Sequence, residues 1–384
     1  MQKILIIHTK YRNLGGEDTA VDNEFELLKE FFDVRVLYFK NTIEKFNDLI
    51  AFFTRKNKKS MQLLQREIDI FNPDLVYVHN TWFKASLGIF QVLEKNNVNI
   101  LLKLHNFRYK CTRSFLTSKH FGNDNFCQAC GLEKKDLGFF NKYYLNSFLK
   151  SLLVNHYGKK YFTYLLNSNI NLAVLTKFHR DYLINLGLEK KRIFIIPNHI
   201  NFNSKTKYKS NSNYLVYAGR VSKEKGVLEL IKAFEKHQNK KIVLKIIGTG
   251  PSYKELEEKY QSDNIHFMGE LPNTEVLKQI KNSKAVITAT KLLEGQPMLL
   301  CEASVSGVPS LYPITGGVAE FFPNDCKLSF NQYDYVNLQE NLNLLDDHEL
   351  LQESGKKNQI YINSHLNKEL IIDKFNKVIS KNNE

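Results

Sequence analysis

No run of apolar residues in the 384-residue sequence approaches the roughly 20 residues that a membrane-spanning helix needs. After Met1-Gln2-Lys3, only four consecutive apolar residues follow, Ile4 to Ile7. A run this short is typical of a buried β-strand and too short for the apolar core of a signal peptide. Cysteine is also scarce, and an odd number of five does not suit the disulfide framework of a secreted protein. We therefore expect a cytoplasmic protein with reduced thiols.

Acidic residues are fewer than basic residues, 40 against 54, which leaves a formal net charge of +14. Such an excess is compatible with nucleic acid, an anionic membrane surface or anionic substrates as partners. The sequence has no nucleic-acid-binding motif and no internal repeat, and its basic residues are dispersed apart from clusters such as 55–59. We expect no nucleic-acid partner. Two interpretations of the charge stay open: peripheral contact with the inner face of the plasma membrane, or a Lys-rich composition unrelated to binding.

The rest of the composition, 43% hydrophobic and 12% aromatic, is typical of a globular chain long enough for two domains. Short apolar runs alternate with helical periodicity, which predicts parallel strands joined by right-handed helical crossovers. The predicted strands are 3–8, 34–39, 74–79, 100–105, 171–175 and 192–196 in the first half, and 214–218, 242–247, 265–268, 285–289 and 308–312 in the second. The polar run 203–213 between the halves is interpreted as a linker.

The most informative stretch directly follows the predicted strand 285–289, and it reads Glu294-Gly295-Gln296-Pro297-Met298-Leu299-Leu300-Cys301-Glu302. Pro297 suits the first residue of a helix, so the next three amides would face out of the carboxyl end of the strand. The helix dipole favours an anion there. Glu294 and Glu302 bracket those amides, and a carboxylate accepts two hydrogen bonds from a vicinal diol. This arrangement predicts a site for a nucleotide-diphosphate sugar.

Glu294 and Glu302, seven residues apart, resemble the E-x7-E motif of retaining family-4 glycosyltransferases, the glycosyl transferases group 1. Gly219-Arg220, four residues before Lys225-Gly226, resembles the family's G-R-x-x-x-x-K-G motif, and 316–320 resembles its G-G-x-x-E turn. The three motifs occur in the expected order. The resemblance implies an α/β protein of the GT-B fold, with two Rossmann-like domains whose parallel sheets face each other across a cleft.

The resemblance also implies a domain organisation. Residues 1–203 would form the acceptor-side domain, with a cysteine-containing insertion at 107–131. Residues 204–360 would form the domain that binds the nucleotide sugar. Residues 361–384 would form a terminal helix that crosses back to the first domain.

The implied reaction is a metal-independent transfer of a hexose, with retained configuration, from a nucleotide-diphosphate sugar. A UDP-sugar is favoured as the donor, and a GDP-sugar stays open. The acceptor would be a glycan or a lipid-linked sugar in cell-envelope polysaccharide synthesis, such as capsule or lipopolysaccharide. Arg220 and Lys225 would neutralise charge on the leaving pyrophosphate, beside Gly219 and the amides before Glu302. Glu302 would bind the ribose and Glu294 the sugar. Gln296 departs from the apolar residue usual in the family, which leaves the choice of sugar open.

Two features of the first half point to the same site. Gly15 and Gly16 form a strand–loop–helix connection, which resembles the Gly-Gly loop that faces the active site in the family. His105 ends the predicted strand 100–105, where open α/β sheets place ligands, and the family has a donor-contacting His at this point. His79, at the end of the preceding strand, is a weaker candidate. For both histidines, a structural hydrogen-bonding role is the alternative.

The insertion 107–131 contains Cys111, Cys127 and Cys130. A Cys-x-x-Cys pair with a third cysteine upstream could bind zinc if His105, His120 or a distant residue supplied a fourth ligand. The spacing is not that of a regular structural zinc site, so we expect no cofactor and assign no metal ligand. Similar cysteine-bearing loops occur in some bacterial polysaccharide glycosyltransferases, and we expect a role in acceptor recognition or as a lid.

Two further functional hypotheses fit the sequence. A GT-B epimerase or hydrolase of sugar nucleotides would form product from the donor alone. A non-catalytic protein that binds nucleotide sugars or polyanions would bind without turnover, with steep salt dependence for a polyanion. The set of Arg220, Lys225, Glu294 and Glu302 favours an enzyme over a binding protein.

Overall fold

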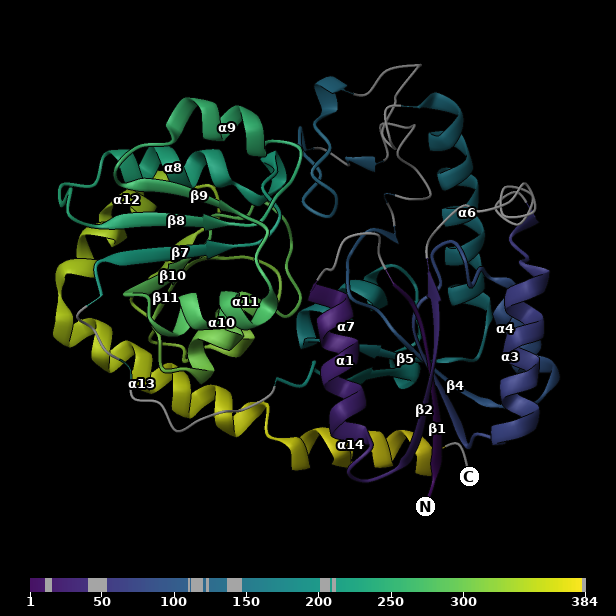
Figure 1. The fold of residues 1–384 in the computed structure, drawn as a ribbon. Helices are drawn as coiled ribbons and strands as arrows, with labels where there is room; N and C mark the ends of the chain where they lie inside the picture. The colour runs from purple at the N-terminus through teal and green to yellow at the C-terminus, as the bar shows by residue number, and fades with distance from the viewer. Residues whose placement is uncertain are drawn as a thin grey trace. The chain divides into compact units, whose positions relative to one another are not determined.

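The computed structural model of the protein describes residues 1–10, 16–40, 54–109, 111, 120–121, 124–136, 147–200, 208 and 212–381. The chain forms two compact units. Unit 1 consists of Met1–His199 together with Asn367–Glu384, and unit 2 of Ile200–Leu366. Each unit is an α/β sandwich around one six-stranded sheet (Figure 1).

The sheet of unit 1 is parallel throughout, with strand order β2-β1-β3-β4-β5-β6. Its strands are β1 (Lys3–Lys10), β2 (Asp33–Lys40), β3 (Leu75–Asn80), β4 (Asn99–Lys103), β5 (Asn171–Val174) and β6 (Ile193–Ile195). Its helices are α1 (Gly16–Leu28), α3 (Lys58–Phe71), α4 (Gly88–Lys95), α6 (Phe148–Asn167), α7 (Lys177–Asn185) and α14 (Lys368–Lys381), with 3-10 turns η2 (Lys134–Asp136) and η3 (Lys190–Arg192). The expected alternation of strands and helices is present. Residues 41–53, between β2 and α3, lie outside the described residues.

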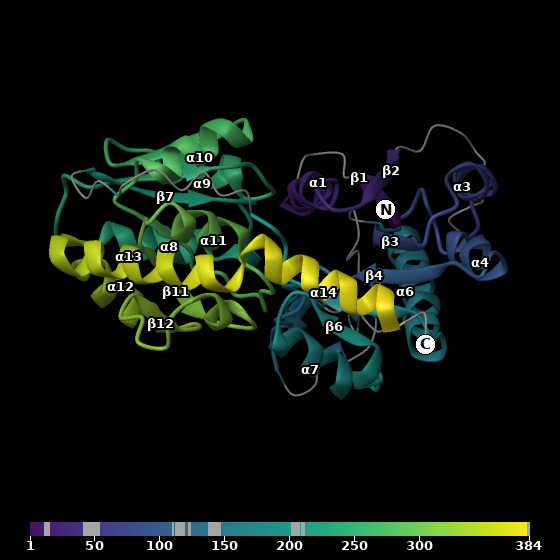
Figure 2. The same cartoon turned by 90° about the horizontal axis from the view of Figure 1, so that it is seen from below.

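Both faces of this sheet are covered, which explains why its strands read as continuous apolar runs rather than as alternating ones. Leu5 and Ile7 of β1 point into one core, which α3, α4, α6 and α7 complete. Ile4 and Ile6 point into the other core, against α1 and α14. The terminal helix α14 (Figure 2) belongs to this second core. In that core the Phe375 ring packs edge-on against the Tyr77 ring, with the ring centroids 5.1 Å apart.

The sheet of unit 2 is also parallel, in the order β12-β11-β10-β7-β8-β9. Its strands are β7 (Tyr214–Ala218), β8 (Val243–Ile247), β9 (Ile265–Gly269), β10 (Ala285–Ile287), β11 (Ser310–Ile314) and β12 (Ser329–Asn331). Its helices are α8 (Val227–Glu235), α9 (Tyr253–Tyr260), α10 (Asn273–Lys281), α11 (Met298–Val305), α12 (Tyr335–Asn343) and α13 (His348–His365), with 3-10 turns η4 (Lys223–Lys225), η5 (Val318–Phe321) and η6 (Leu344–Asp346). After β11 the chain forms only the short turn η5 before β12, and not a regular α-helix.

Side-chain caps set the starts of several helices. Thr176 and Asp347 accept hydrogen bonds from the amides of His179 and Leu350, and so begin α7 and α13. Pro297 is different, because it is the N-cap of α11 in an extended conformation rather than its first helical residue. Its carbonyl accepts from the Cys301 amide at 3.0 Å, so the first helical position moves by one residue relative to the expectation. No helix in the described part of the chain is both long enough and apolar enough to cross a bilayer.

Candidate functional site

The strand order of unit 2 defines where a ligand is expected. The chain leaves β7 for β8 and β9 on one side, and later returns to β10, β11 and β12 on the other side. The loops after the two central strands, β7 and β10, therefore part from each other at the carboxyl edge of the sheet. Such a switch point is where open α/β sheets bind ligands. Gly219-Arg220 follow β7, and Glu294 lies in the loop after β10.

Glycines allow the loops at this edge to approach one another through their backbones. A Cβ atom on Gly248 would lie 2.1 Å from the Gly219 carbonyl oxygen, and one on Gly226 would lie 1.9 Å from the Ala289 carbonyl oxygen. Both glycines also have positive φ, +120° at Gly248 and +68° at Gly226. Larger residues would force the loops after β7, β8 and β10 apart. Gly226 of the G-R-x-x-x-x-K-G motif thus has a packing role, and the Gly219 carbonyl of the same motif packs closely against Gly248.

Glu294 is the best-connected side chain of this edge. Its Oε1 atom accepts from Lys225 Nζ at 2.6 Å and from Thr290 Oγ1 at 3.0 Å. Its backbone oxygen accepts from the Gly317 amide at 2.8 Å, and a Cβ on Gly316 would lie 2.3 Å from the same oxygen. The three motifs noted in the sequence therefore meet at Glu294. Glu294 is partly buried, and hydrogen bonds to its carboxylate and to its backbone oxygen fix its position.

The two motif cations have different surroundings. Lys225 ends the turn η4, and its side chain is 30% exposed beside Glu294. Arg220 is 56% exposed, and its nearest carboxylate atom is Glu224 Oε1 at 4.0 Å. The Arg220 backbone is fixed by a hydrogen bond that the Tyr217 hydroxyl donates to its carbonyl at 2.9 Å. The Arg220 guanidinium is therefore accessible to an anion, whereas Lys225 is already neutralised by a carboxylate.

Glu302 lies in helix α11, which begins directly after the loop that holds Glu294. Helix geometry provides no intrahelical acceptor for the amides in the first turn of α11. Gln296, which departs from the family pattern, is buried beside this turn. Burial raises the pKa of the Glu302 carboxyl to about 7. A hydrogen-bond donor that favours the charged form would therefore change its ionisation near neutral pH.

In unit 1, Gly15 lies outside the described residues, and Gly16 is the first residue of α1. A Cβ on Gly16 would meet nothing within 4 Å, so the helix start is open. His105 follows β4, and its Nε2 lies 3.2 Å from Nδ1 of His79, with the two rings stacked at 5.4 Å. Burial is the main cause that holds the pKa of both imidazoles well below the usual value of 6.5. Both rings are therefore neutral at physiological pH.

Sequence reasoning missed a buried ion pair under these histidines. Lys103 Nζ of β4 contacts Glu24 Oε1 of α1, and both side chains are fully buried. Glu24 Oε2 accepts from the Tyr77 hydroxyl at 3.1 Å and lies 3.5 Å from Nε2 of His79. Burial raises the pKa of Glu24 and lowers that of Lys103, and the contact with the partner opposes both changes. The pair supports the strand ends from which His79 and His105 project.

A signal for this pair was present in the sequence. Glu24 lies at helical spacing from Val21 and Leu28, which are both core residues of α1, and Lys103 interrupts an apolar strand. An ionisable residue in each buried stripe indicates a buried pair. A second missed contact joins the buried side chains His8 and Asp18 at 2.8 Å.

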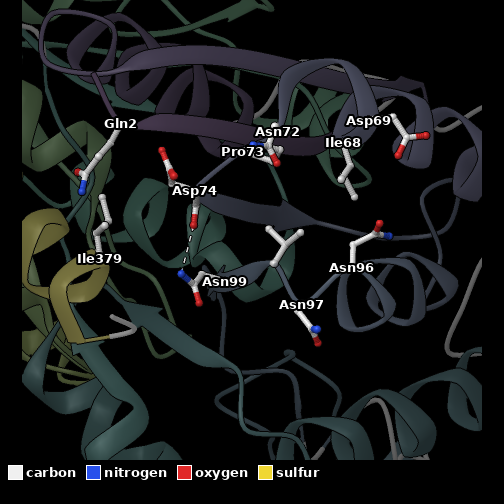
Figure 3. A pocket seen from close by; sticks show the side chains of 11 residues that line it. Gln2, Ile68, Asp69, Asn72, Pro73, Asp74, Asn96, Asn97, Asn99 and Ile379 are labelled. Carbon is white, nitrogen blue, oxygen red and sulfur yellow. Dashed lines mark hydrogen bonds between the residues drawn. The ribbon is translucent and has the colours of Figure 1, made fainter. Parts of the chain in front are cut away.

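A hollow of about 440 Å³ lies at the opposite, amino end of strands β1, β3 and β4 (Figure 3). Asn99 Nδ2 donates to the Asp74 carbonyl at 3.3 Å there, and Ile379 of α14 lines one side. Its polar lining consists of neutral amide side chains and of the carboxylates Asp69 and Asp74. None of the described lining residues is a cation that could bind a pyrophosphate. We therefore do not assign the donor site to it.

Comparisons with known proteins bear on both units. Residues 199–363, most of unit 2, match the family model described as Glycosyl transferases group 1. The whole chain is similar in structure to the Anabaena protein Alr3699/HepE in complex with UDP and glucose, with a TM-score of 0.69 and 14% identity over 99% of this chain and 100% of that one. The same Anabaena protein was also solved with UDP-glucose.

Two further solved structures are similar at 99% coverage of each chain. Sucrose-phosphate synthase from Thermosynechococcus elongatus gives a TM-score of 0.73 at 15% identity. The apo form of the lipopolysaccharide outer core galactosyltransferase WaaB gives 0.60 at 14% identity. At these identities the likeness shows the fold, and the fold of this chain is GT-B, as expected from the sequence. A search of curated proteins found no match to this sequence.

Proposed function

We propose that this chain is a retaining glycosyltransferase of group 1, which transfers a hexose from a nucleotide-diphosphate sugar to a glycan or lipid-linked acceptor of the cell envelope. UDP is the proposed nucleotide. The family match of unit 2 and the solved complexes of a similar protein with UDP and UDP-glucose support this choice of donor class.

The observation that carries the proposal is the contact between Lys225 and Glu294 at the switch point of unit 2, beside the first turn of α11. The cation and the helix N-terminus suit the pyrophosphate of a nucleotide sugar, and the carboxylate suits its sugar hydroxyls. Lys225 and Glu294 neutralise each other in the structure. Donor binding would separate them, with Lys225 turning to phosphate oxygen and Glu294 to sugar hydroxyls.

The proposed reaction breaks the bond between the anomeric carbon and the leaving phosphate oxygen. A new bond forms from that carbon to the acceptor oxygen on the same face, and the acceptor proton passes to the leaving phosphate. Negative charge builds on the pyrophosphate as the bond breaks. Arg220 offers a planar fork to it, Lys225 a compact charge, and the α11 amides a fixed dipole. These groups supply the charge stabilisation that a divalent cation would otherwise supply, so we propose metal-independent transfer.

Glu302 is proposed to bind the ribose. Its carboxylate would accept from the two ribose hydroxyls, and these donors would favour the charged form of a group whose pKa burial raises to about 7. Gln296 is buried next to the same turn, where it would influence which sugar fits. The proposal assigns no covalent nucleophile.

Unit 1 is proposed to carry the acceptor side. His105 is a neutral imidazole held by His79, so it would act as a hydrogen-bond partner for a sugar hydroxyl and not as a cation. The open helix start at Gly16 leaves room for a ligand close to the backbone. The excess of basic residues is compatible with an acceptor at an anionic membrane surface.

The first experiment is a thermal-unfolding panel of UDP- and GDP-sugars in buffer that contains EDTA. A ligand at about a hundred times its Kd stabilises the folded protein by about 2.7 kcal/mol, which is readily measured. We expect one uridine donor to raise the melting temperature with EDTA present and the Lys225→Ala variant to show a smaller rise. The active donor is then incubated with candidate lipid-linked acceptors, and NMR of the product reads the anomeric configuration.

The outcomes separate this proposal from its rivals. Equal product without acceptor would indicate a hydrolase or epimerase. Binding without turnover of any acceptor, with steep salt dependence, would indicate a polyanion-binding protein. Binding that requires Mg²⁺ or Mn²⁺ would contradict the metal-independent donor site. An inverted anomeric configuration would contradict retention.

A further inference from the structure

The geometry points to a structural zinc site in unit 1, made by Cys111, His120, Cys127 and Cys130. The sequence left such a site as the less favoured interpretation because the spacing of the three cysteines is irregular. The tertiary structure changes this assessment. One potential ligand atom from each of the four residues converges, and all four atoms lie within 4.8 Å of one another.

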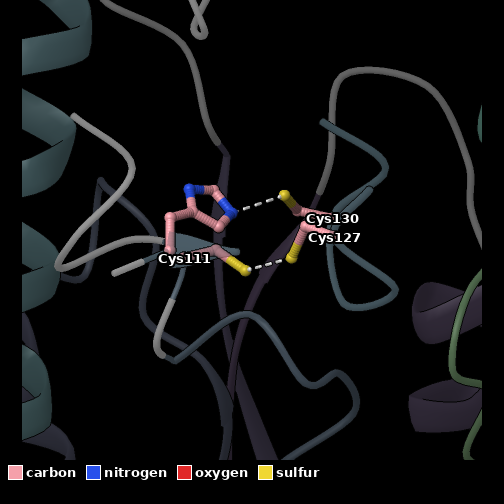
Figure 4. Close-up of side chains that lie close together, drawn as sticks. Cys111, Cys127 and Cys130 are labelled. Carbon is pink, nitrogen blue, oxygen red and sulfur yellow. Dashed lines mark hydrogen bonds between the residues drawn. The ribbon is translucent and has the colours of Figure 1, made fainter. Parts of the chain in front are cut away.

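The individual distances fit a tetrahedral site. The Sγ atoms of Cys111 and Cys127 lie 3.3 Å apart, and Nε2 of His120 lies 3.2 Å from Sγ of Cys130 (Figure 4). Around tetrahedral zinc, with Zn–S of about 2.3 Å and Zn–N of about 2.0 Å, ligand atoms are separated by about 3.5 to 3.8 Å. Small side-chain rotations would bring the four atoms to these separations. Three thiolates and one imidazole are one of the common ligand sets of structural zinc.

A tight hairpin presents two of the thiols on the same side. The amides of Cys130 and Gly131 both donate to the Cys127 carbonyl, at 3.3 and 2.8 Å, and the Cys127 amide donates to Leu132 at 2.9 Å. Gly131 has φ of +84°, which a residue with a side chain rarely adopts. An isolated antiparallel bridge between residues 126 and 133 closes the hairpin. The backbone of this turn therefore directs the Cys127 and Cys130 thiols toward Cys111 and His120.

The surroundings favour a metal over a plain thiol core. Cys111 and His120 are almost completely buried, and the Cys127 and Cys130 thiols lie close to them. Buried groups of this kind are normally paired with one another or bound to a metal. One disulfide would involve only two of the three cysteines, so the third thiol and the imidazole would take no part in it. A single Zn²⁺ uses all four groups, and four protein ligands leave no open position for catalysis, so the role is structural.

The site would have a definite effect on the molecule. Its first ligand, Cys111, comes six residues after His105, so a bound ion fixes the chain that leaves β4 at the carboxyl edge of the unit 1 sheet. This inference does not depend on the proposed transferase activity. It concerns a protein-bound ion that is separate from the donor site of unit 2.

The test begins with wild-type protein, purified with a tag that does not bind metals and under reducing conditions. Elemental analysis is expected to find one zinc per chain. Thiol modification with a mercurial reagent should release that zinc to a colorimetric chelator. Replacement by Co²⁺ should give the intense d–d and thiolate charge-transfer bands of a tetrahedral thiolate site. These readouts need neither donor nor acceptor, so they are independent of whether the transferase assay succeeds.

Two matched variants locate the ion. Cys127→Ser should lose the zinc and the thiolate-to-cobalt band, whereas Cys326→Ser, which changes a partly buried thiol of unit 2, should keep both. The inference is overturned if reduced wild-type protein from zinc-supplemented cells contains no zinc above background and takes up no Co²⁺. Mass spectrometry that finds a Cys111–Cys127 disulfide in protein alkylated at lysis would also overturn it. If Cys127→Ser does not fold, the wild-type cobalt spectrum decides alone.

Discussion

Affinity for a UDP-sugar is expected to rise with pH through neutrality, because the proposed ribose contact needs the Glu302 carboxylate. Burial raises the pKa of this carboxyl to about 7. At a pH one unit below its pKa, only about one molecule in eleven has the charged form. If the charged form alone binds, the Kd at pH 6 is about tenfold higher than at high pH, a loss of about 1.4 kcal/mol.

The same pKa sets a stability effect of defined sign. A carboxyl with pKa about 7 when folded and 4.5 when unfolded binds more protons in the folded state between these values. Its contribution to the free energy of unfolding therefore falls as pH rises through this window, and amounts to a cost of at most about 3 kcal/mol above pH 7. Glu302→Gln is expected to remove this cost, so the variant should be more stable than wild type at alkaline pH.

Calorimetric titration with UDP-glucose, from about pH 6 to about pH 8, measures the binding effect. UDP-glucose is the appropriate probe because its pyrophosphate is esterified at both ends, whereas a terminal phosphate monoester titrates near pH 6. His105 will not contribute, since its imidazole stays neutral in this range. Glu302→Gln serves as the control and should bind with an affinity that hardly changes with pH. Equal pH dependence in the two proteins, or a wild-type affinity that falls with rising pH, would refute the assignment of Glu302.

Three further predictions follow from contacts in the structure. Lys225→Ala should lower turnover in a steady-state assay about a hundredfold or more, which is the usual effect of losing an electrostatic stabiliser. The control variant Lys223→Ala, which changes an exposed neighbour, should stay near wild type. Near-normal turnover of Lys225→Ala would contradict a catalytic role for Lys225. Gly226→Ala should destabilise the protein by about 1 to 3 kcal/mol, since its Cβ would lie 1.9 Å from a backbone oxygen and φ is +68°; an unchanged melting temperature would contradict the close loop contact. Lys103→Met should cost about 3 to 5 kcal/mol by leaving the Glu24 carboxylate buried without a cation, as read by denaturant unfolding. The double variant Glu24→Gln/Lys103→Met should recover most of that loss, and failure to do so would mean that the ion pair is not its cause.

Most of the fold could be predicted from the sequence because strand and helix periodicity is local. The continuous apolar runs at β1, β3 and β4 require a sheet covered on both faces, and the alternation with helices requires parallel strands. The short edge strand β12, Ser329–Asn331, was missed since three residues with one buried side chain carry no periodic signal. The first helical residue of α11 lies one residue later than predicted, because Pro297 has an extended backbone with ψ of 92°.

The candidate site was predictable in part. Motif order and the carboxyl-edge rule assign Arg220, Lys225 and Glu294 to one region, since each follows a strand of the same predicted parallel sheet. Their catalytic and binding roles stay predictions. Sequence could not show that Lys225 is neutralised by Glu294, a carboxylate 69 residues away in the chain.

The sequence by itself determined the alternation of elements, the parallel sheets and the edge on which the motifs lie, because these depend on short-range periodicity. Only the tertiary structure decided the pairings between distant residues. Glu24 and Lys103 are 79 residues apart, and burial in one core makes the charge of each depend on the other. His120 and Cys130 likewise become neighbours only through the hairpin that follows. Such contacts arise from chain packing, which no local pattern of residues specifies.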